Sequence, residues 1–445
     1  MDRDELRQAM QERLTRVPMI DVHTHLIGGN LGAKGLHDIV LYHMAVSDLY
    51  AAGCPSGVRL TQYPGWPSKE EAHARLKEAI PYFECTRNTA MSHGARVILR
   101  DIYGVDEPVT ESNWEAIDAK IRERADDRAW HREIINKANI KRFGTELARR
   151  EGGCDDDILQ YALEWAFFTR CQWGEYDTAL YELERCWGRQ PEYPVPIGGQ
   201  RPASERTIRS LEDVHEAMKW YMDNIPAEVL SIATHISTDI HLHPVSDDQM
   251  SDALAKRNEA GAKERDIYAS YINEAFLTAL EDRENRIVFQ FSSGAEPLPF
   301  ETASRLSQRT ISQIADVISR HPKLHFQCFV SSQHANQSLC TLCRELPNLS
   351  LAGYWWHNFF PPIIRRVMEE RLDMLPVNKQ VGFFSDAYCV EWVYGKAAMV
   401  RAELADVLAG KVLRGQFTEN EATSIAEDIC FNTPQTLLGM IPANK

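Results

Sequence analysis

The chain has 445 residues, of which 44% are hydrophobic and 25% are charged, a balance typical of globular proteins with a large buried core. Its formal net charge of −15 argues against a general nucleic-acid-binding function, because binding to phosphates requires a basic excess. No stretch approaches the roughly eighteen uncharged apolar residues that a membrane-spanning helix needs, so we expect no membrane partner.

The N-terminal segment, "MDRDELRQAMQERLTRVP", predicts a charged helix and lacks the apolar centre of a signal peptide. Ten cysteines are scattered along the chain without paired spacing. This pattern favours reduced thiols over a disulfide framework. We therefore expect a cytoplasmic protein.

Short apolar runs rich in β-branched residues alternate with helical patterns along the chain. Continuous apolar strands separated by helices favour a parallel sheet covered by helices, and eight of them favour a closed (β/α)8 TIM barrel. An open doubly wound sheet is the alternative, but no glycine-rich phosphate loop follows the first strand. The third run contains two prolines, which central strands disfavour. The expected strands are residues 18–23, 139–145, 193–199, 229–237, 286–292, 323–330, 348–356 and 380–386.

The interval between the first two expected strands is unusually long. Residues 26–137 carry helical patterns that are broken by "CPSGVRLTQYPGWPS". No linker rich in glycine and serine and no internal repeat marks a separate domain. We therefore expect a single barrel domain over residues 1–445, with 26–137 as a helical cap at its catalytic end.

Two histidines stand at the end of the first strand, in "VPMIDVHTHLIGG". Side chains alternate along a strand, so His23 and His25 should point the same way. In such barrels chemistry gathers at the carboxyl ends of the strands, where Asp386 follows the eighth strand beside the first. Two imidazoles and a carboxylate with one open position suit zinc or a similar divalent ion. The alternatives are a structural histidine pair and a helix N-cap role for Asp386.

Several motifs resemble those of known families. "IDVHTHL", "FFSDA" and "ICFNTPQTLLGM" together resemble the amidohydrolase superfamily of metal-dependent barrels. Within it, the chain most resembles the uronate (glucuronate) isomerases, through "DIVLYHMAVSDLYAAG", "ECTRNTAMSHGARVILRDIYG", "GGQRPAS" and "ELPNLSLAGYWWHNFFP". The resemblance implies aldose–ketose isomerisation of a hexuronate or related sugar acid, with one divalent metal ion held by His23, His25 and Asp386.

The resemblance also assigns residues around the metal. Arg201 matches the arginine that helps hold the substrate carboxylate, a role that suits the two-pronged guanidinium. A surface salt bridge is the alternative for this residue. His43 matches a histidine beside the site, although a histidine packed inside the cap would also fit.

Four positions depart from the isomerase pattern. Met44 replaces a tyrosine, Tyr388 replaces an arginine and Ser292 replaces a histidine. His334 lies where a glutamate is expected. The pocket thereby loses a phenol, a cation and an imidazole, so other groups must carry out proton transfer.

The candidates for these roles come from several strand ends. Asp386 is the leading base, with His43, His334 and Tyr388 as further catalytic candidates. Trp355 and Trp356 could stack on a sugar or belong to the core. The substrate-binding candidates are Arg201, Trp355, Trp356 and His357, and the cluster His235, Asp239, His241 and His243 could either assist or form an exposed loop.

Three functions agree with these features. The first is an isomerase acting on a sugar acid, which needs a base and an electrophile to stabilise an enediolate oxygen. The second is a metal-dependent hydrolase or decarboxylase, in which the metal lowers the pKa of a bound water. The third is a homologue that binds a sugar acid without catalysis. We expect a small anionic substrate as the partner, and a homo-oligomer.

Overall fold

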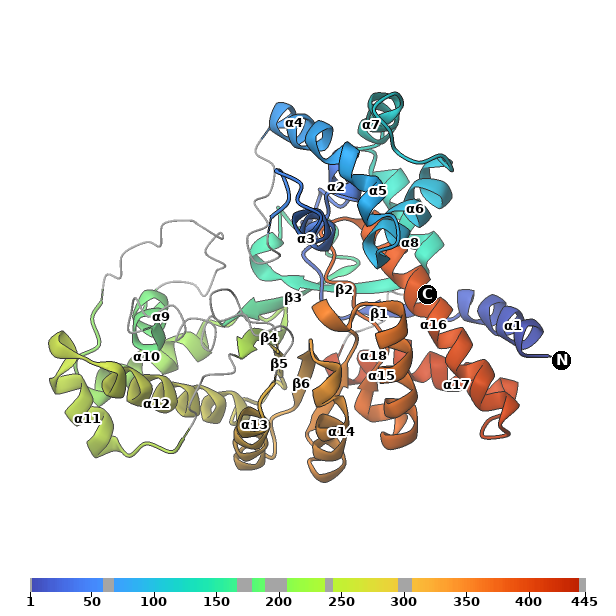
Figure 1. Cartoon of the computed structure of the whole chain (residues 1–445). Coiled ribbons are helices and arrows are strands. Elements are labelled where there is room, and N and C mark those ends of the chain that lie inside the picture. Colours follow the sequence, from blue (N-terminus) through green and yellow to red (C-terminus); the bar gives the residue numbers. More distant parts are fainter. Residues whose placement is uncertain are drawn as a thin grey trace.

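The strands of the protein form one parallel sheet. The computed structural model describes residues 2–58, 68–165, 178–188, 206–236, 243–294 and 306–439. Within these residues, eight parallel strands pair in chain order from β1 to β8 (Figure 1). They are β1 (Met19–Asp21), β2 (Ile140–Glu146), β3 (Leu159–Glu164), β4 (Val229–Ile236), β5 (Val288–Ser293), β6 (Phe326–Val330), β7 (Leu349–Ala352) and β8 (Gln380–Val381).

Backbone hydrogen bonds join the two ends of this sheet beyond the last strand residues. The amide of Asp386 donates to the carbonyl of His23 at 2.9 Å, and the amide of His25 donates to the carbonyl of Ala387 at 2.8 Å. The segment after β8 is thus paired with the segment after β1. The predicted (β/α)8 barrel is confirmed.

Apolar side chains fill the barrel and a second set packs against the helices. Val288 belongs to the interior cluster, whereas its neighbour Phe289 packs with the helices outside, as the two-residue period of a strand requires. The interior cluster contains Ile20, Val22, Val288, Phe329, Ala352, Trp355, Val381, Phe384 and Leu438.

The third strand differs from the prediction. Residues 193–199 lie outside the described residues, and β3 is formed by Leu159–Glu164. Its sequence, "LQYALE", consists largely of helix-favouring residues. Local propensity therefore predicts a helix here rather than the observed strand. The alternation of Leu159, Tyr161 and Leu163, all buried, is the strand signal.

Helices occupy the described part of the interval between β1 and β2. Two of them, α6 and α8, pack against the long helix α16 (Val390–Leu413). Figure 1 shows α2 to α8 grouped on one side of the sheet, in blue to cyan. They are α2 (His37–Val40), α3 (His43–Ala51), α4 (Lys69–Ala79), η2 (Ile80–Tyr82), α5 (Phe83–Thr86), α6 (Ala90–Tyr103), α7 (Trp114–Arg122) and α8 (Arg128–Ala138).

The remaining helices follow from ordinary start signals and amphipathic patterns. Ser307 caps one of them by accepting a hydrogen bond from the amide of Thr310. No helix in the described ranges is long and apolar enough to cross a membrane. These helices are α1 (Arg3–Thr15), η3 (Leu147–Arg149), α9 (Thr178–Cys186), α10 (Leu211–Asp223), α11 (Asp247–Ala255), η5 (Arg257–Glu259), α12 (Ala262–Glu281), α13 (Gln308–Arg320), η6 (Gln333–Ala335), α14 (Asn336–Glu345), η7 (Trp356–Asn358), α15 (Pro361–Met374), η8 (Val377–Lys379), α17 (Glu419–Glu427), η9 (Asp428–Asn432) and α18 (Thr433–Leu438).

Candidate metal centre and active site

The two histidines lie in the segment that continues β1. Between them, Thr24 binds the carbonyl of Gly144 through its amide at 2.7 Å and its hydroxyl at 2.8 Å. A Cβ atom on Gly144 would lie 2.4 Å from the carbonyl oxygen of Val22, so glycine is needed for this close approach to β2. The anchored Thr24 leaves its neighbours His23 and His25 on the opposite side, with ring centroids 5.1 Å apart.

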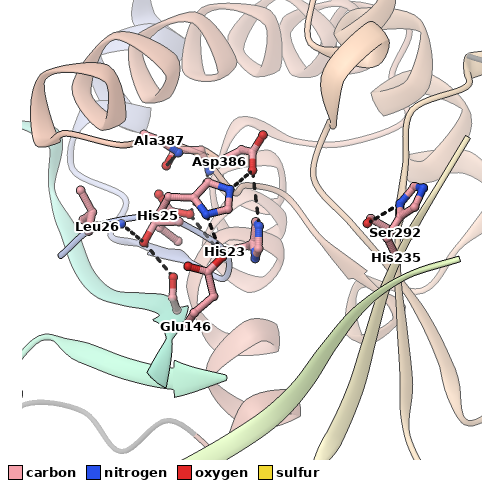
Figure 2. Close-up of polar contacts among 12 residues, drawn as sticks. His23, His25, Leu26, Glu146, His235, Ser292, Asp386 and Ala387 are labelled. Carbon is pink, nitrogen blue, oxygen red and sulfur yellow. Dashed lines mark hydrogen bonds and ion pairs between the residues drawn. The ribbon is translucent and has the colours of Figure 1, made fainter. Parts of the chain in front are cut away.

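Asp386 meets these histidines from the segment after β8. Its Oδ1 lies 3.4 Å from Nε2 of His23 and 3.1 Å from Nε2 of His25 (Figure 2). One donor atom from each of the three side chains lies within 4.8 Å of the others. The structure thus brings together the three predicted metal ligands.

The backbone of Asp386 is held in an uncommon conformation. Its φ of 55° is in the left-handed region, which costs a non-glycine residue on the order of 1 kcal/mol or more. The hydroxyl of Tyr42 donates to the carbonyl of Asp386 at 2.9 Å, and Nζ of Lys396 donates to that hydroxyl at 3.0 Å. Lys396 also donates to the carbonyl of Ser385 at 2.5 Å. These buried contacts support the turn that presents the carboxylate.

Glu146, the last residue of β2, contacts His25 on the side opposite Asp386. Its Oε1 lies 2.8 Å from Nδ1 of His25, and its Oε2 accepts from Nε of Arg149 (Figure 2 shows the contact with His25). The two ring nitrogens of His25 therefore face two different carboxylates. With Nδ1 facing Glu146, deprotonation of Nε2 would leave that nitrogen to bind a metal ion beside Asp386, which is the arrangement of a metal-binding histidine.

The charges in the site are set by these contacts. Burial favours a neutral Asp386, but its contacts with His23 and His25 outweigh burial and hold its pKa well below the usual value. Burial likewise opposes ionisation of Glu146, yet His25 and Arg149 lower its pKa to about 2. Burial would lower the pKa of His25, but Tyr388, Glu146 and Asp386 raise it well above its usual value.

Aromatic rings form the wall next to the histidines. Tyr388 stacks on His25, with ring centroids 4.7 Å apart. His43 lies 5.8 Å from the rings of both Tyr388 and Trp356. Burial lowers the pKa of His43 to about 4, so its imidazole is neutral near pH 7. A neutral imidazole beside the carboxylate can accept or pass on a proton.

The strand ends across the barrel contribute a second histidine contact. His235, near the end of β4, has its Nδ1 3.1 Å from Oγ of Ser292 on β5 (Figure 2). Its ring also lies 5.5 Å from that of Trp355. Ser292 therefore contacts the histidine of the neighbouring strand.

The other predicted site residues are spread more widely. Trp355 is buried in the barrel cluster, and Trp356 is partly exposed at the start of η7. His357, in the same turn, has its ring 6.3 Å from that of Trp356, whereas His334 is exposed in η6. His243 pairs with Asp266 on α12 at 2.7 Å. Arg201, Asp239 and His241 lie outside the described residues.

Sequence reasoning missed four residues that the structure places around the centre. Glu146 directly follows the second predicted strand, so its place at a carboxyl strand end is a signal that could have identified it. Arg149 follows in the next turn. Tyr42 and Lys396 belong to no local motif and reach Asp386 only through packing between distant segments. Met44 is buried in the core cluster on α3.

Comparisons with known proteins add to this geometry. No protein-family model matches the sequence, and no curated protein sequence matches it either. Solved structures do match over almost the whole length. The chain has the fold of the uronate isomerases.

Three of these structures show the extent of the similarity. A uronate isomerase from Thermotoga maritima has a TM-score of 0.78 at 12% identity, covering 98% of this chain and 97% of that one. A glucuronate isomerase from Caulobacter crescentus gives 0.77 at 14% identity, covering 99% and 97%. A uronate isomerase from Bacillus halodurans gives 0.72 at 17% identity, covering 100% and 98%. A proposed metal-dependent hydrolase from Lactobacillus casei is less similar, with a TM-score of 0.57 at 13% identity, covering 97% of each chain.

Proposed function

We propose that the protein is a metal-dependent isomerase that interconverts the aldose and ketose forms of a hexuronate or a related sugar acid. One observation carries the proposal: His23, His25 and Asp386 converge at the carboxyl end of a barrel whose fold is that of uronate isomerases. Fold alone does not define a reaction, so the argument rests on the chemistry of this site.

The donor set of the site fits a metal ion. Two imidazole nitrogens and one carboxylate oxygen suit a first-row divalent ion, and zinc is our choice because it favours such mixed sets with an open position. The contact between Glu146 and His25 supports this fit, because it directs Nε2 towards the other two ligands. When bound, one such ion would polarise a carbonyl or hydroxyl oxygen of the sugar.

The protein groups would carry the proton. Isomerisation moves a proton between adjacent carbons and so requires a positioned base. The lowered pKa of Asp386 keeps its carboxylate ionised, and this carboxylate lies beside the rings of His23 and His25. Asp386 is therefore our candidate base. His43 and Tyr388 line the same wall and could pass the proton between the sugar oxygens. The cationic side chain of Arg149 lies beside the site, which fits a small anionic substrate.

The alternative is hydrolysis or decarboxylation on the same ligands. A hydrolase would use Asp386 to take a proton from water rather than from carbon. This alternative is supported by the similarity of the fold to that of a proposed metal-dependent hydrolase. The two reactions leave different isotopic traces, which allows one experiment to separate them.

The test uses purified protein loaded with zinc and a panel of hexuronates, acidic lactones and acylated amino acids. We expect a ketose product from at least one hexuronate, and solvent deuterium on carbon when the reaction is run in D2O. Asp386→Asn keeps the shape but removes the base, so kcat should fall by about 100-fold or more. Oxygen-18 from water in the carboxylate newly formed from a lactone or an acylated amino acid would instead indicate a hydrolase, and full activity in Asp386→Asn would refute both mechanisms.

A further inference from the structure

Arg149 lies one side chain away from the metal-facing histidines. It ends η3, the turn after β2, and its Nε donates to Glu146, whose other oxygen contacts His25. The centre of its guanidinium lies 5.9 Å from the ring of Tyr388, and that ring stacks on His25. Glu146 and Tyr388 thus hold the guanidinium beside the site from two directions.

Among the described residues, the outer edge of this guanidinium has no partner. Its hydrogen bond within the described part of the chain uses Nε, and neither Nη group has a hydrogen-bond partner there. The side chain is 25% exposed. The neighbouring Arg150 differs, because its Nη1 binds Glu228 at 2.5 Å and its Nη2 binds Asp156 at 2.6 Å. The two Nη groups of a planar guanidinium match the two oxygens of a carboxylate.

Lys396, another cation near the candidate ligands in the described part of the chain, cannot take this role. Lys396 is 2% exposed, and its Nζ is occupied by the hydroxyl of Tyr42 and the carbonyl of Ser385. A divalent ion at the ligands would offset the charges of Asp386 and Glu146. The charge of Arg149 would then attract an anion at the accessible side of the site.

We propose that Arg149 binds the carboxylate of the substrate through its two Nη groups while the sugar oxygens face His23, His25 and Asp386. The ligand class is a small polyhydroxy carboxylic acid, with its carboxylate at one end and its reacting carbons at the other. This inference rests on the proposed function for the orientation of the sugar. It adds a carboxylate-binding residue at the end of β2.

The test measures binding by calorimetry to zinc-loaded protein, with D-glucuronate and D-galacturonate as acidic probes and D-glucose as the neutral probe. The variants are Arg149→Met and Arg149→Lys, and the matched control is Arg150→Met. Metal content and circular dichroism are measured first, so that only folded, equally loaded proteins are compared.

We expect Arg149→Met to weaken binding of the acidic probes by about 100-fold, because a charge-assisted contact with two parallel hydrogen bonds is lost. Arg149→Lys should recover part of the affinity, since an ammonium attracts the anion but cannot form two parallel hydrogen bonds. Arg150→Met should bind like the wild type, and glucose binding should not change in any variant.

Two results would overturn the inference: unchanged hexuronate affinity in Arg149→Met, or no binding of either acidic probe by the wild type. Failure of the proposed isomerase reaction gives a different result. The wild type would then bind a hexuronate in an Arg149-dependent way without forming a ketose, and the carboxylate site would stand.

Discussion

Single residues decide whether the three ligands can act together. His25 lies between two carboxylates. Its Nδ1 faces Glu146, and its Nε2 faces Asp386. Glu146 is itself held by Arg149, so one carboxylate orders a histidine on one side and a guanidinium on the other. The metal affinity of the proposed site should therefore depend on Glu146, a residue that need not touch the ion.

Replacement of Glu146 tests this dependence. In Glu146→Gln the negative charge that favours a proton on Nδ1 of His25 is lost, so affinity for zinc should fall by about 10- to 100-fold. Competition with a chromogenic chelator measures the change. Glu151→Gln, an exposed carboxylate on the connection between β2 and β3, is the control and should bind zinc like the wild type. Equal affinities in the two variants would show that Glu146 plays no part in positioning His25.

An ion pair whose strength depends on pH joins the outer helices α12 and α13. Glu274 on α12 contacts Arg320 at the end of α13, with 2.8 Å between Oε2 and Nη2, and lies 3.3 Å from Nε2 of His321. Partial burial opposes ionisation of Glu274, but His321 and Arg320 lower its pKa from 4.5 to about 2. The carboxylate thus binds its proton less readily in the folded state than in the unfolded state.

This difference predicts a loss of stability in acid. A carboxyl group with a lowered folded-state pKa stabilises the fold above its ordinary value of 4.5, and the stabilisation disappears as the pH falls towards about 2. Because the pair is partly exposed, we expect about 1 kcal/mol near neutral pH. Urea unfolding of the wild type and Glu274→Gln should differ by this amount at neutral pH and converge in acid.

The exposed Glu284→Gln variant provides the reference for a carboxylate outside this network. It should match the wild type throughout the pH range. A difference between the wild type and Glu274→Gln that stays constant with pH would contradict the electrostatic explanation and indicate altered packing between α12 and α13.

Elements also differ in how far their sequences reveal them. β5 and β6 have apolar, aromatic sequences and were predicted to within three residues of their observed ends. β3 was missed because "LQYALE" favours a helix locally, and its strand state comes from pairing with β2 and β4. His23 and His25 were predicted because their spacing alone places them on one side. Tyr42 and Lys396 were not, because their positions depend on packing between distant segments. Glu146 was overlooked although it directly follows the second predicted strand.

At the scale of the whole molecule, the ligands connect the first and last strands of the barrel. An ion bound there should stabilise the entire fold, since unfolding separates the segments that supply its ligands. At a free zinc concentration 100 times the dissociation constant, the gain is about 2.7 kcal/mol. Thermal unfolding should therefore occur at a higher temperature with zinc than with a chelator.

The double variant His23→Ala, His25→Ala should abolish this zinc-dependent increase while remaining folded. The exposed His334→Ala serves as its control and should keep the full increase. Elemental analysis of the purified proteins gives the matching metal content. Unchanged metal content in the double variant would mean that the two histidines have only a structural role.

The pairing of His25 with Asp386 has a consequence for how the protein is made. His25 and Asp386 are separated by 361 positions in sequence, so the ribosome must synthesise almost the entire barrel before the carboxylate can meet the imidazoles. Contacts of such long separation form slowly, because a long loop must close first. Assembly of the proposed metal site should therefore be a late event, and a nascent chain arrested before β8 would be unable to assemble the centre.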